Sequence, residues 1–223
     1  MNLDYYRQSV AHHGLGATIY HAAYRAANHV TEVAVWNALV LDESLLDKSF
    51  LPSDGRAPGR MVEAAEMWRY VEDPENVLTD RFIDEAVARG DRCYVICDEA
   101  DDIMSYGWYS TRPTRLSEVD GAPVLHFDPK YAYMYHAYTR PVHRGRRLHA
   151  FGMAAALLEC TKTGLRGLVS YAVASNFSSL KSCYRMGYQT FGHVVMLKVG
   201  AHHVWHATPG CAMYGFRVEE AAS

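Results

Sequence analysis

The chain has 223 residues, of which 49% are apolar, 21% charged and 12% aromatic. This composition is typical of a globular protein and excludes a disordered tail, a collagen-like chain and a coiled-coil rod. A chain of this length buries roughly 70% of its unfolded surface, so it needs no disulfide or metal to fold. The net charge of −3 gives no reason to expect binding to nucleic acid.

Cysteine usage and hydropathy indicate the cellular setting. Five scattered cysteines, an odd number without C-x-x-C spacing, indicate reduced thiols and a cytoplasmic protein. The start of the chain lacks the features of a signal peptide, and no stretch is apolar enough to span a bilayer. His202, His203 and His206 form H-H-x-x-H, but without a nearby carboxylate or cysteine this motif predicts no metal site.

The first part of the chain is interrupted once, by the segment PSDGRAPGR at 52–60, where proline, glycine and charge gather. Residues 1–60 are therefore expected to form an N-terminal elaboration packed on a core of residues 61–223, within a single domain overall. The pattern predicts a helix, a strand and two amphipathic helices, in the order Ala17–Asn28, Val33–Leu41, Met61–Val71 and Pro74–Arg89.

The rest of the chain is mostly extended. Helices are predicted at Arg146–Thr163 and Ser178–Arg185. The predicted strands are Arg92–Asp98, Ile103–Ser110, Val124–Asp128, Lys130–Thr139, Gly167–Ala174, Tyr188–Val199, His203–His206 and Ala212–Val218. Helices before and between strands, with an antiparallel tail, predict an α/β fold with a mixed sheet.

The strongest functional signal is a strand that ends at Thr139, turns through the basic segment R-P-V-H-R-G-R-R and enters an apolar helix near Leu148. A strand that feeds a helix through a short turn leaves the first-turn amides unpaired, and the helix dipole adds positive potential there. The arginines of the turn, Arg144, Arg146 and Arg147, add positive charge. This arrangement predicts a phosphate site.

Two motifs in this region resemble those of the GNAT superfamily of N-acyltransferases. The family has a V-x-P-x-Y-R-G-x-G-x-G/A turn before a helix, and the first five named positions here hold Thr139, Pro141, His143, Arg144 and Gly145. The segment from 174 to 188 looks like the family's N-x-x-S/A…Y-x-x-x-G-F pattern, with Asn176 and Gly187 at the right spacing. The resemblance covers roughly residues 90–200.

The resemblance implies a GNAT-like fold, with a mostly antiparallel central sheet flanked by helices. It also implies transfer of an acyl group, most often acetyl, from an acyl-coenzyme A (acyl-CoA) thioester to a small-molecule amine by direct attack in a ternary complex. Backbone donors at the end of the strand would polarise the thioester carbonyl. The residues expected at the cofactor are Tyr138, Thr139, Arg140, Arg144, Gly145, Arg146, Arg147, Leu148 and Asn176.

The sequence departs from the family pattern in two places. Arg147 and His149 stand where the family has glycine, which implies a looser cradle for coenzyme A, or a cradle for the phosphopantetheine arm of an acyl-carrier protein. Cys183, and not Tyr184, falls at the family's catalytic tyrosine. Either residue, or no side chain at all, would then act as the acid.

For the base, the aromatic strand offers Tyr133 and His136 as catalytic candidates, with Tyr135 as a further lining residue. Of these, His136 has the unperturbed pKa best suited to base catalysis. Strand alternation predicts Tyr133, Tyr135, Ala137 and Thr139 on one face and Met134, His136 and Tyr138 on the other.

Two alternatives to a CoA-dependent acetyltransferase stay open at this point. One is an acyl-carrier-protein-dependent N-acyltransferase that makes long-chain N-acyl amino acids or related lipids and needs an apolar tunnel for the chain. The other is a GNAT fold that binds or senses a ligand without catalysis, which the two departures from the family pattern would explain. A homodimer is a family-level expectation only.

Overall fold

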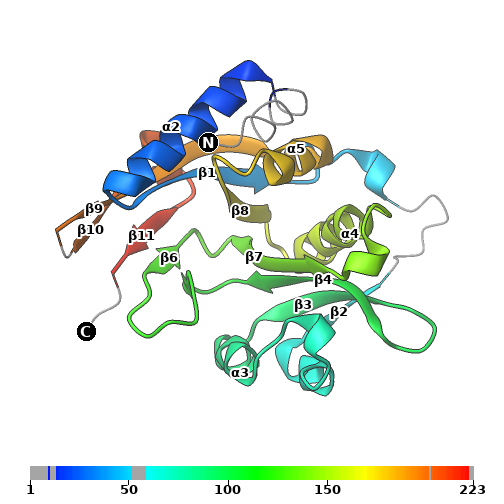
Figure 1. The fold of residues 1–223 in the computed structure, drawn as a ribbon. Helices are drawn as coiled ribbons and strands as arrows, with labels where there is room; N and C mark the ends of the chain where they lie inside the picture. Colours follow the sequence, from blue (N-terminus) through cyan, green and yellow to red (C-terminus); the bar gives the residue numbers. More distant parts are fainter. Residues whose placement is uncertain (1–9, 11–13, 52–58, 201, 221–223) are drawn as a thin grey trace.

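The computed structural model describes residues 10, 14–51, 59–200 and 202–220 of the chain. Figure 1 shows a large sheet with helices on both of its faces. The large sheet contains eight strands, which in chain order are β1 (Val33–Leu41), β2 (Arg60–Glu63), β3 (Arg92–Cys97), β4 (Ile103–Ser110), β7 (Tyr131–Thr139), β8 (Gly167–Val173), β9 (Gln189–Val199) and β10 (His202–Ala207). A second sheet contains β5 (Thr114–Arg115), β6 (Val124–His126) and β11 (Arg217–Glu219).

The large sheet has the spatial order β10-β9-β1-β8-β7-β4-β3-β2. Its neighbouring strands run antiparallel except β7 and β8, which are parallel. The connecting helices are α2 (Leu15–Val30), α3 (Asp80–Arg89), α4 (Leu148–Lys162), α5 (Phe177–Met186) and α6 (Pro209–Ala212), with the short 3₁₀ helices η1 (Lys48–Phe50), η2 (Ala64–Tyr70), η3 (Pro74–Asn76) and η4 (Pro141–His143). The predicted fold class, a mixed and mostly antiparallel sheet flanked by helices, is confirmed.

Each face of the large sheet buries its own apolar cluster. On one face α4 inserts Met153 and Leu157 against Leu168 of β8. On the opposite face Ile83 of α3 packs with Trp108 of β4. Because these side chains are at most 1% exposed, each contributes about 1.5–3 kcal/mol through apolar burial.

Three sequence predictions fail at element boundaries, and each failure has a local cause. The helix expected at Met61–Val71 is instead β2 followed by η2, because residues 60–63 pair with the edge of β3 before Glu63 forms a capping box with Glu66. The helix expected at Pro74–Arg89 divides into η3 and α3, because Val77 is left-handed (φ 54°). The interruption at 52–60 lies largely outside the described residues.

The third failure lies at the C-terminal end. The strand expected at Ala212–Val218 begins as α6, with Pro209 in its first turn, and only residues 217–219 are extended. Proline at the first helical position is favoured, because the missing N–H would be unpaired there in any case. The sequence run G-C-A-M-Y-G that follows Pro209 therefore closes as a helical turn rather than pairing as a strand.

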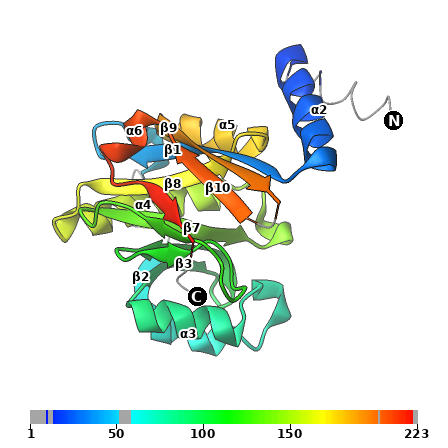
Figure 2. The same cartoon turned by 90° about the vertical axis from the view of Figure 1, so that its left-hand side faces the viewer.

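The N-terminal segment contributes an inner strand to the sheet. β1 lies between β8 and β9 and is antiparallel to both, and its Leu39 and Leu41 are fully buried. Residues 33–41, which the sequence analysis assigned to an elaboration on the core, thus belong to the central sheet, while the boundary at residue 60 stays a prediction. The preceding helix α2 stands out from the body of the sheet (Figure 2) and exposes Leu15 and Ile19.

The two parallel strands separate soon after they meet. β7 and β8 pair only from Tyr131–Gly167 to Tyr133–Val169. One residue further on, the Ser170 hydroxyl donates to the Met134 carbonyl at 2.8 Å, and no pairing between the two strands is recorded beyond that point in the described part of the chain. The remaining length of β7 therefore presents an open backbone edge.

Candidate functional site

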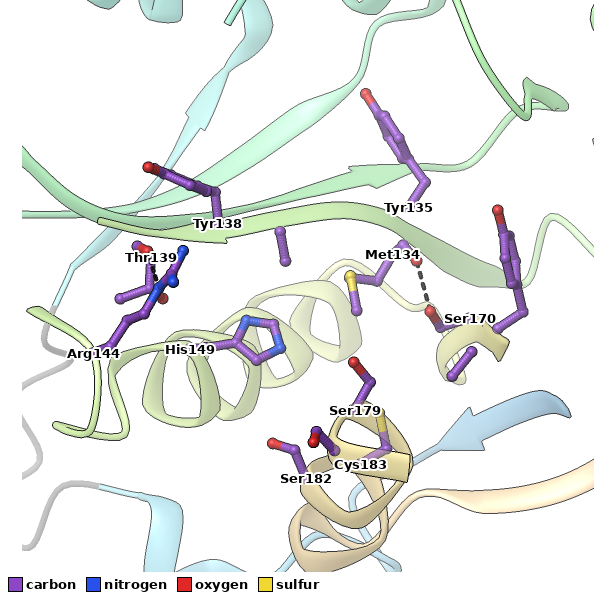
Figure 3. Close-up of a pocket in the computed structure, with 14 residues that line it drawn as sticks. Met134, Tyr135, Tyr138, Thr139, Arg144, His149, Ser170, Ser179, Ser182 and Cys183 are labelled. Carbon is purple, nitrogen blue, oxygen red and sulfur yellow. Dashed lines mark hydrogen bonds between the residues drawn. The ribbon is translucent and has the colours of Figure 1, made fainter. Parts of the chain in front are cut away.

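A groove of about 670 Å³ occupies the space where β7 and β8 part. Figure 3 shows Met134 and Arg144 from the β7 side, His149 from α4 and Cys183 from α5 converging on it. The complete lining is Met134, Tyr135, Ala137, Tyr138, Thr139, Arg144, His149, Ser170, Tyr171, Ala172, Ser178, Ser179, Ser182 and Cys183. The site is thus assembled from β7, β8, the turn after β7 and the N-terminal parts of α4 and α5.

The open edge of β7 offers two backbone N–H groups to this groove. The Arg140 N–H donates to the Met104 carbonyl at 3.0 Å, and the Ser105 hydroxyl donates to the Tyr138 carbonyl at 2.9 Å. Since polar groups alternate between the two sides of a strand, Tyr138 and Arg140 face β4, whereas Ala137 and Thr139 face the groove. The backbone donors expected at the end of the strand were those of Tyr138, Thr139 and Arg140. Of these, only the Thr139 N–H faces the groove, and the N–H of Ala137 was not predicted.

The turn between β7 and α4 leaves several amides without partners. Gly145 (φ 79°) and Arg147 (φ 59°) are left-handed, and α4 begins at Leu148 without a side-chain cap. In the described part of the chain, the amides of residues 145–147 donate to no backbone carbonyl, and the first-turn amides of a helix have no intrahelical acceptor. Together with the positive end of the helix dipole, these amides suit a phosphate group.

Arginine and histidine stand at two positions of the turn where the motif has glycine. Arg147 adopts the left-handed conformation that glycine favours, at a cost of about 1–2 kcal/mol for a residue with a side chain. His149, at the second glycine position, projects toward the groove (Figure 3), and burial lowers its pKa to about 4, so it is neutral at neutral pH and adds no charge.

The arginines of the turn point in different directions. Arg144 lines the groove and donates from Nε to the Thr139 carbonyl at 3.2 Å, while Arg146 is exposed and bonds to Nδ1 of His143 at 3.2 Å. Arg147 lines a second cavity of about 400 Å³ together with Arg185. This cavity, which Asp47 also lines, shares His149 and Ser182 with the groove.

Arg140 lies apart from the groove. Its guanidinium forms an ion pair with Asp73 and donates to Oδ1 of the buried Asn76 at 2.7 Å, on the face of the sheet that carries α3. The side chain ties η3 to the end of β7, and its amide is occupied by β4. The contact with a cofactor expected for Arg140 therefore has no available donor in this arrangement.

Helix α5 presents Cys183 to the groove and turns Tyr184 away from it. Cys183 lines the groove, and burial raises the pKa of its thiol to about 11. Tyr184 is 46% exposed, and its hydroxyl lies 2.9 Å from Oγ1 of Thr190. One residue is about 100° of helical rotation, which explains the difference. Asn176 accepts from the Ser179 N–H at 3.1 Å and so acts as the cap that starts α5.

A β-bulge changes which side chains of β7 share a face. Trp108 of β4 lies opposite His136, but Tyr109 lies opposite Met134, so Tyr135 is the inserted residue. The predicted alternation is therefore wrong. Tyr135 and His136 both contact the ring of Phe82 on the α3 face, at centroid distances of 5.9 and 5.2 Å, whereas Met134 packs with the cluster around α4.

The α3 face holds a cavity of about 220 Å³ that meets the groove at the gap. Its lining is Phe82, Glu85, Arg89, Thr114, Arg115, Leu116, Ser117, Glu118, Tyr133, Tyr135, His136 and Tyr171. Tyr135 and Tyr171, one from each of the diverging strands, line both spaces. We call this space the α3-side cavity. A ligand in it and a ligand in the groove would approach each other through the sheet.

The two base candidates lie on this second side. His136 lines the α3-side cavity, its Nε2 is 3.2 Å from the Tyr106 hydroxyl, and burial lowers its pKa. The imidazole is therefore neutral at neutral pH and able to accept a proton. Tyr133 is 2% exposed and packs between the rings of Phe127 and Tyr171, and burial raises its pKa well above the ordinary value. A phenol in that setting stays protonated.

The described residues lack two kinds of feature. No group of three or more His, Cys, Asp or Glu side chains among them is arranged to hold a metal ion. Within the same part of the chain, no helix has the length and apolar character needed to cross a bilayer. Of the histidines near the C-terminus, His203 contacts Glu32 at 3.3 Å.

Solved structures with a similar fold include acetyltransferases of the GNAT family. One from Novosphingobium aromaticivorans has a TM-score of 0.51 at 14% identity, covering 74% of this chain and 63% of its own. Another, from Colwellia psychrerythraea, has a TM-score of 0.50 at 10% identity, covering 78% and 60%. This chain thus spans less than two thirds of the length of either structure.

No protein-family model matches the chain, and no curated protein matches its sequence. The likeness therefore concerns the fold: the chain has the GNAT acetyltransferase fold. This agrees with the strand, turn and helix arrangement from which the resemblance was first inferred.

Proposed function

We propose that the protein is an N-acyltransferase that moves an acyl group, most often acetyl, from acyl-CoA to an amine. The observation that carries the proposal is the run of unpaired amides at 145–150, backed by Arg144, at the mouth of the groove between β7 and β8. The turn suits anionic phosphates. The open edge of β7 suits an extended pantetheine arm, whose amide groups need backbone hydrogen-bond partners. An acyl-CoA combines these two features in one molecule.

The chemistry requires a polarised carbonyl and a neutral amine. The N–H groups of Ala137 and Thr139 face the groove and would donate to the thioester, so that negative charge developing on its oxygen is stabilised. The amine would enter from the α3-side cavity and pass between Tyr135 and Tyr171. His136, neutral because burial lowers its pKa, would accept the proton that the ammonium group must lose.

The leaving group needs no acid from the protein. The pKa of about 11 for Cys183 makes its thiol a weaker acid than an ordinary cysteine thiol, whose pKa is about 8.5. Cys183 is therefore a poor proton donor to a departing thiolate. The same high pKa keeps Cys183 from acting as a thiolate nucleophile, which favours direct transfer to the amine over a covalent acyl-enzyme.

The side chains that line the groove also indicate the length of the acyl chain. Ser178, Ser179 and Ser182 of α5 face the groove, so that part of its wall is polar rather than an apolar tunnel. This favours a short acyl group over the long chain that a carrier-protein-dependent enzyme would deliver. Transfer from a loaded acyl-carrier protein is the alternative, and measurements of binding and turnover with both donors distinguish it from transfer from acyl-CoA.

Thermal unfolding in the presence of coenzyme A species tests the proposal. Acetyl-CoA at a hundredfold excess over Kd should stabilise the protein by about 2.7 kcal/mol, and thiol should be released when an amine panel is added. Arg144→Ala should raise Kd about 10- to 100-fold through loss of a charge-assisted contact. The matched control Arg166→Ala removes an exposed arginine at the other end of α4 and should leave Kd unchanged.

Three outcomes would contradict the proposal. The first is no stabilisation by any coenzyme A species together with acylation from a loaded carrier protein. The second is binding without turnover on a broad amine panel, which would indicate a sensing module. The third is an unchanged Kd for Arg144→Ala, which would remove the phosphate assignment from the turn.

A further inference from the structure

Two charged side chains that line the α3-side cavity, Arg115 and Glu118, can still bind a charged ligand. In the described part of the chain, the single ion pair of Arg115 is with Glu85 at 3.7 Å. Glu85 is shared, because Arg81 and Arg89 also contact it, at 3.3 and 3.6 Å. Arg115 is 42% exposed, so most of its five guanidinium N–H groups remain available for a planar anion such as a carboxylate.

The opposite charge is supplied by Glu118. Its carboxylate accepts from the Thr79 hydroxyl at 2.8 Å, and among the described residues it forms no ion pair with a Lys, Arg or His. Glu118 and His136 line the same cavity. Burial is the larger influence on the pKa of His136 and lowers it, while the charge of Glu118 raises it. A negative charge is therefore placed near the proposed base, where an ammonium group would have to give up its proton.

The other charges of the cavity are already neutralised. Arg89 contacts Asp91 at 2.7 Å, and the Asp91 side chain is fully buried. The Tyr135 hydroxyl donates to the same carboxylate at 2.8 Å. This buried set holds the ring of Tyr135 at the gap and leaves no charge for a ligand. One guanidinium and one carboxylate thus remain, which complements a zwitterion.

The volume and the lining of the cavity further restrict the size and the chemical class of the ligand. Its volume of about 220 Å³ lies below the range of about 300–1,000 Å³ typical of drug-sized ligands. Rings of Phe82, Tyr133, Tyr135 and Tyr171 contribute to its lining. These walls suit a compact ligand with an apolar or aromatic side chain.

We propose that the acceptor is a compact amino acid, whose carboxylate binds Arg115 and whose amino group lies between Glu118 and His136. The inference rests on the proposed acyl transfer and names the substrate class for that same site. The ammonium group gives one proton to His136, and the nitrogen lone pair forms the C–N bond at the thioester carbonyl. The C–S bond breaks with its electron pair on sulfur, and the second proton of the nitrogen ends on the thiolate.

Matched acceptor pairs test this proposal directly. Phenylalanine and 2-phenylethylamine, and leucine and 3-methylbutylamine, differ only by the carboxylate, and thiol release from acetyl-CoA reports turnover. The amino acid of at least one pair should have a kcat/KM at least tenfold above that of its amine. In Arg115→Gln this preference should disappear. The matched control Arg112→Gln changes a nearby exposed arginine outside the cavity lining and should retain it.

Acetyl-CoA binding to each variant is measured alongside turnover, so that two failures can be told apart. If acetyl-CoA binds but amines are used as well as or better than their amino acids, the acceptor inference is wrong and acyl transfer stands. If Arg115→Gln keeps the preference, the assignment of the carboxylate site is wrong. If acetyl-CoA neither binds nor is turned over, the proposed function fails, and the acceptor inference fails with it.

Discussion

His136 combines a half-buried, neutral imidazole with a position on the α3-side cavity. Its neutral form is the active one for proton acceptance, and a lowered pKa extends that form to more acidic pH. The acid limb of kcat/KM is therefore expected below pH 6.5, the ordinary histidine value. His136→Gln should lower kcat about 10²- to 10⁴-fold and leave acetyl-CoA affinity unchanged, as measured by titration and steady-state kinetics.

A control at the same scale is His126→Gln, which changes a histidine of β6 that pairs with Glu219 at 3.1 Å, outside the lining of the α3-side cavity. It should retain both kcat and the acid limb. An acid limb above pH 6.5, or the same limb in His136→Gln, would show that another group accepts the proton.

Residue types alone indicated the basic turn and left Cys183 and Tyr184 as alternatives on the second helix, but they did not indicate where side chains point. Arg140 and Arg144 have the same chemistry, four positions apart, yet one ties η3 to β7 and the other lines the groove. Nothing local to the sequence separates them, because the partners of Arg140 lie at Asp73 and Asn76 in another element. Ala137 was missed for a similar reason: a backbone donor carries no side-chain signal.

At the scale of elements, Gly187 connects α5 to the N-terminal segment. It ends α5 in a left-handed conformation (φ 103°), and a Cβ there would overlap the carbonyl of Leu45. Gly187→Ala should cost about 2–5 kcal/mol of unfolding free energy, from left-handed strain plus steric overlap. Gly164→Ala is the matched control, because Gly164 is also left-handed (φ 91°) but has open space around it.

Denaturant unfolding of the two glycine variants measures this difference. Gly164→Ala is expected to cost only the conformational strain, about 1–2 kcal/mol. Equal costs for the two substitutions would contradict the close approach of α5 to Leu45, and with it the placement of the α5 residues that line the groove.

Elements with a single strong pattern were predicted well, and those that depend on a distant partner were not. The bounds of β1 and β4 match the prediction at both ends, because each is a compact apolar run between clear breaks. The bulge at Tyr135 could not be predicted, since it arises from register against Trp108 and Tyr109 on β4. That single inserted residue moves His136 to the same face as Tyr135 and so decides which cavity His136, the proposed base, lines.

At the scale of the whole molecule, the N-terminal strand β1 is an inner strand of the large sheet. β1 joins β8, which borders the groove, to β9 and β10. Leu39→Ala removes a fully buried side chain of β1 and should cost about 2–5 kcal/mol. Leu15→Ala, at a position 64% exposed on α2, should change stability by no more than about 0.5 kcal/mol. Similar values for both, by denaturant unfolding, would contradict the inner position of β1.

The central claim is that the turn between β7 and α4 and the open edge of β7 together bind an acyl-CoA. Titration of the ¹⁵N-labelled protein with acetyl-CoA, followed by amide chemical shifts, tests it most directly. The largest shifts are expected at Ala137, Thr139, Gly145, Arg146 and Arg147. Shifts confined to other surfaces, or none at saturating acetyl-CoA, would contradict the account.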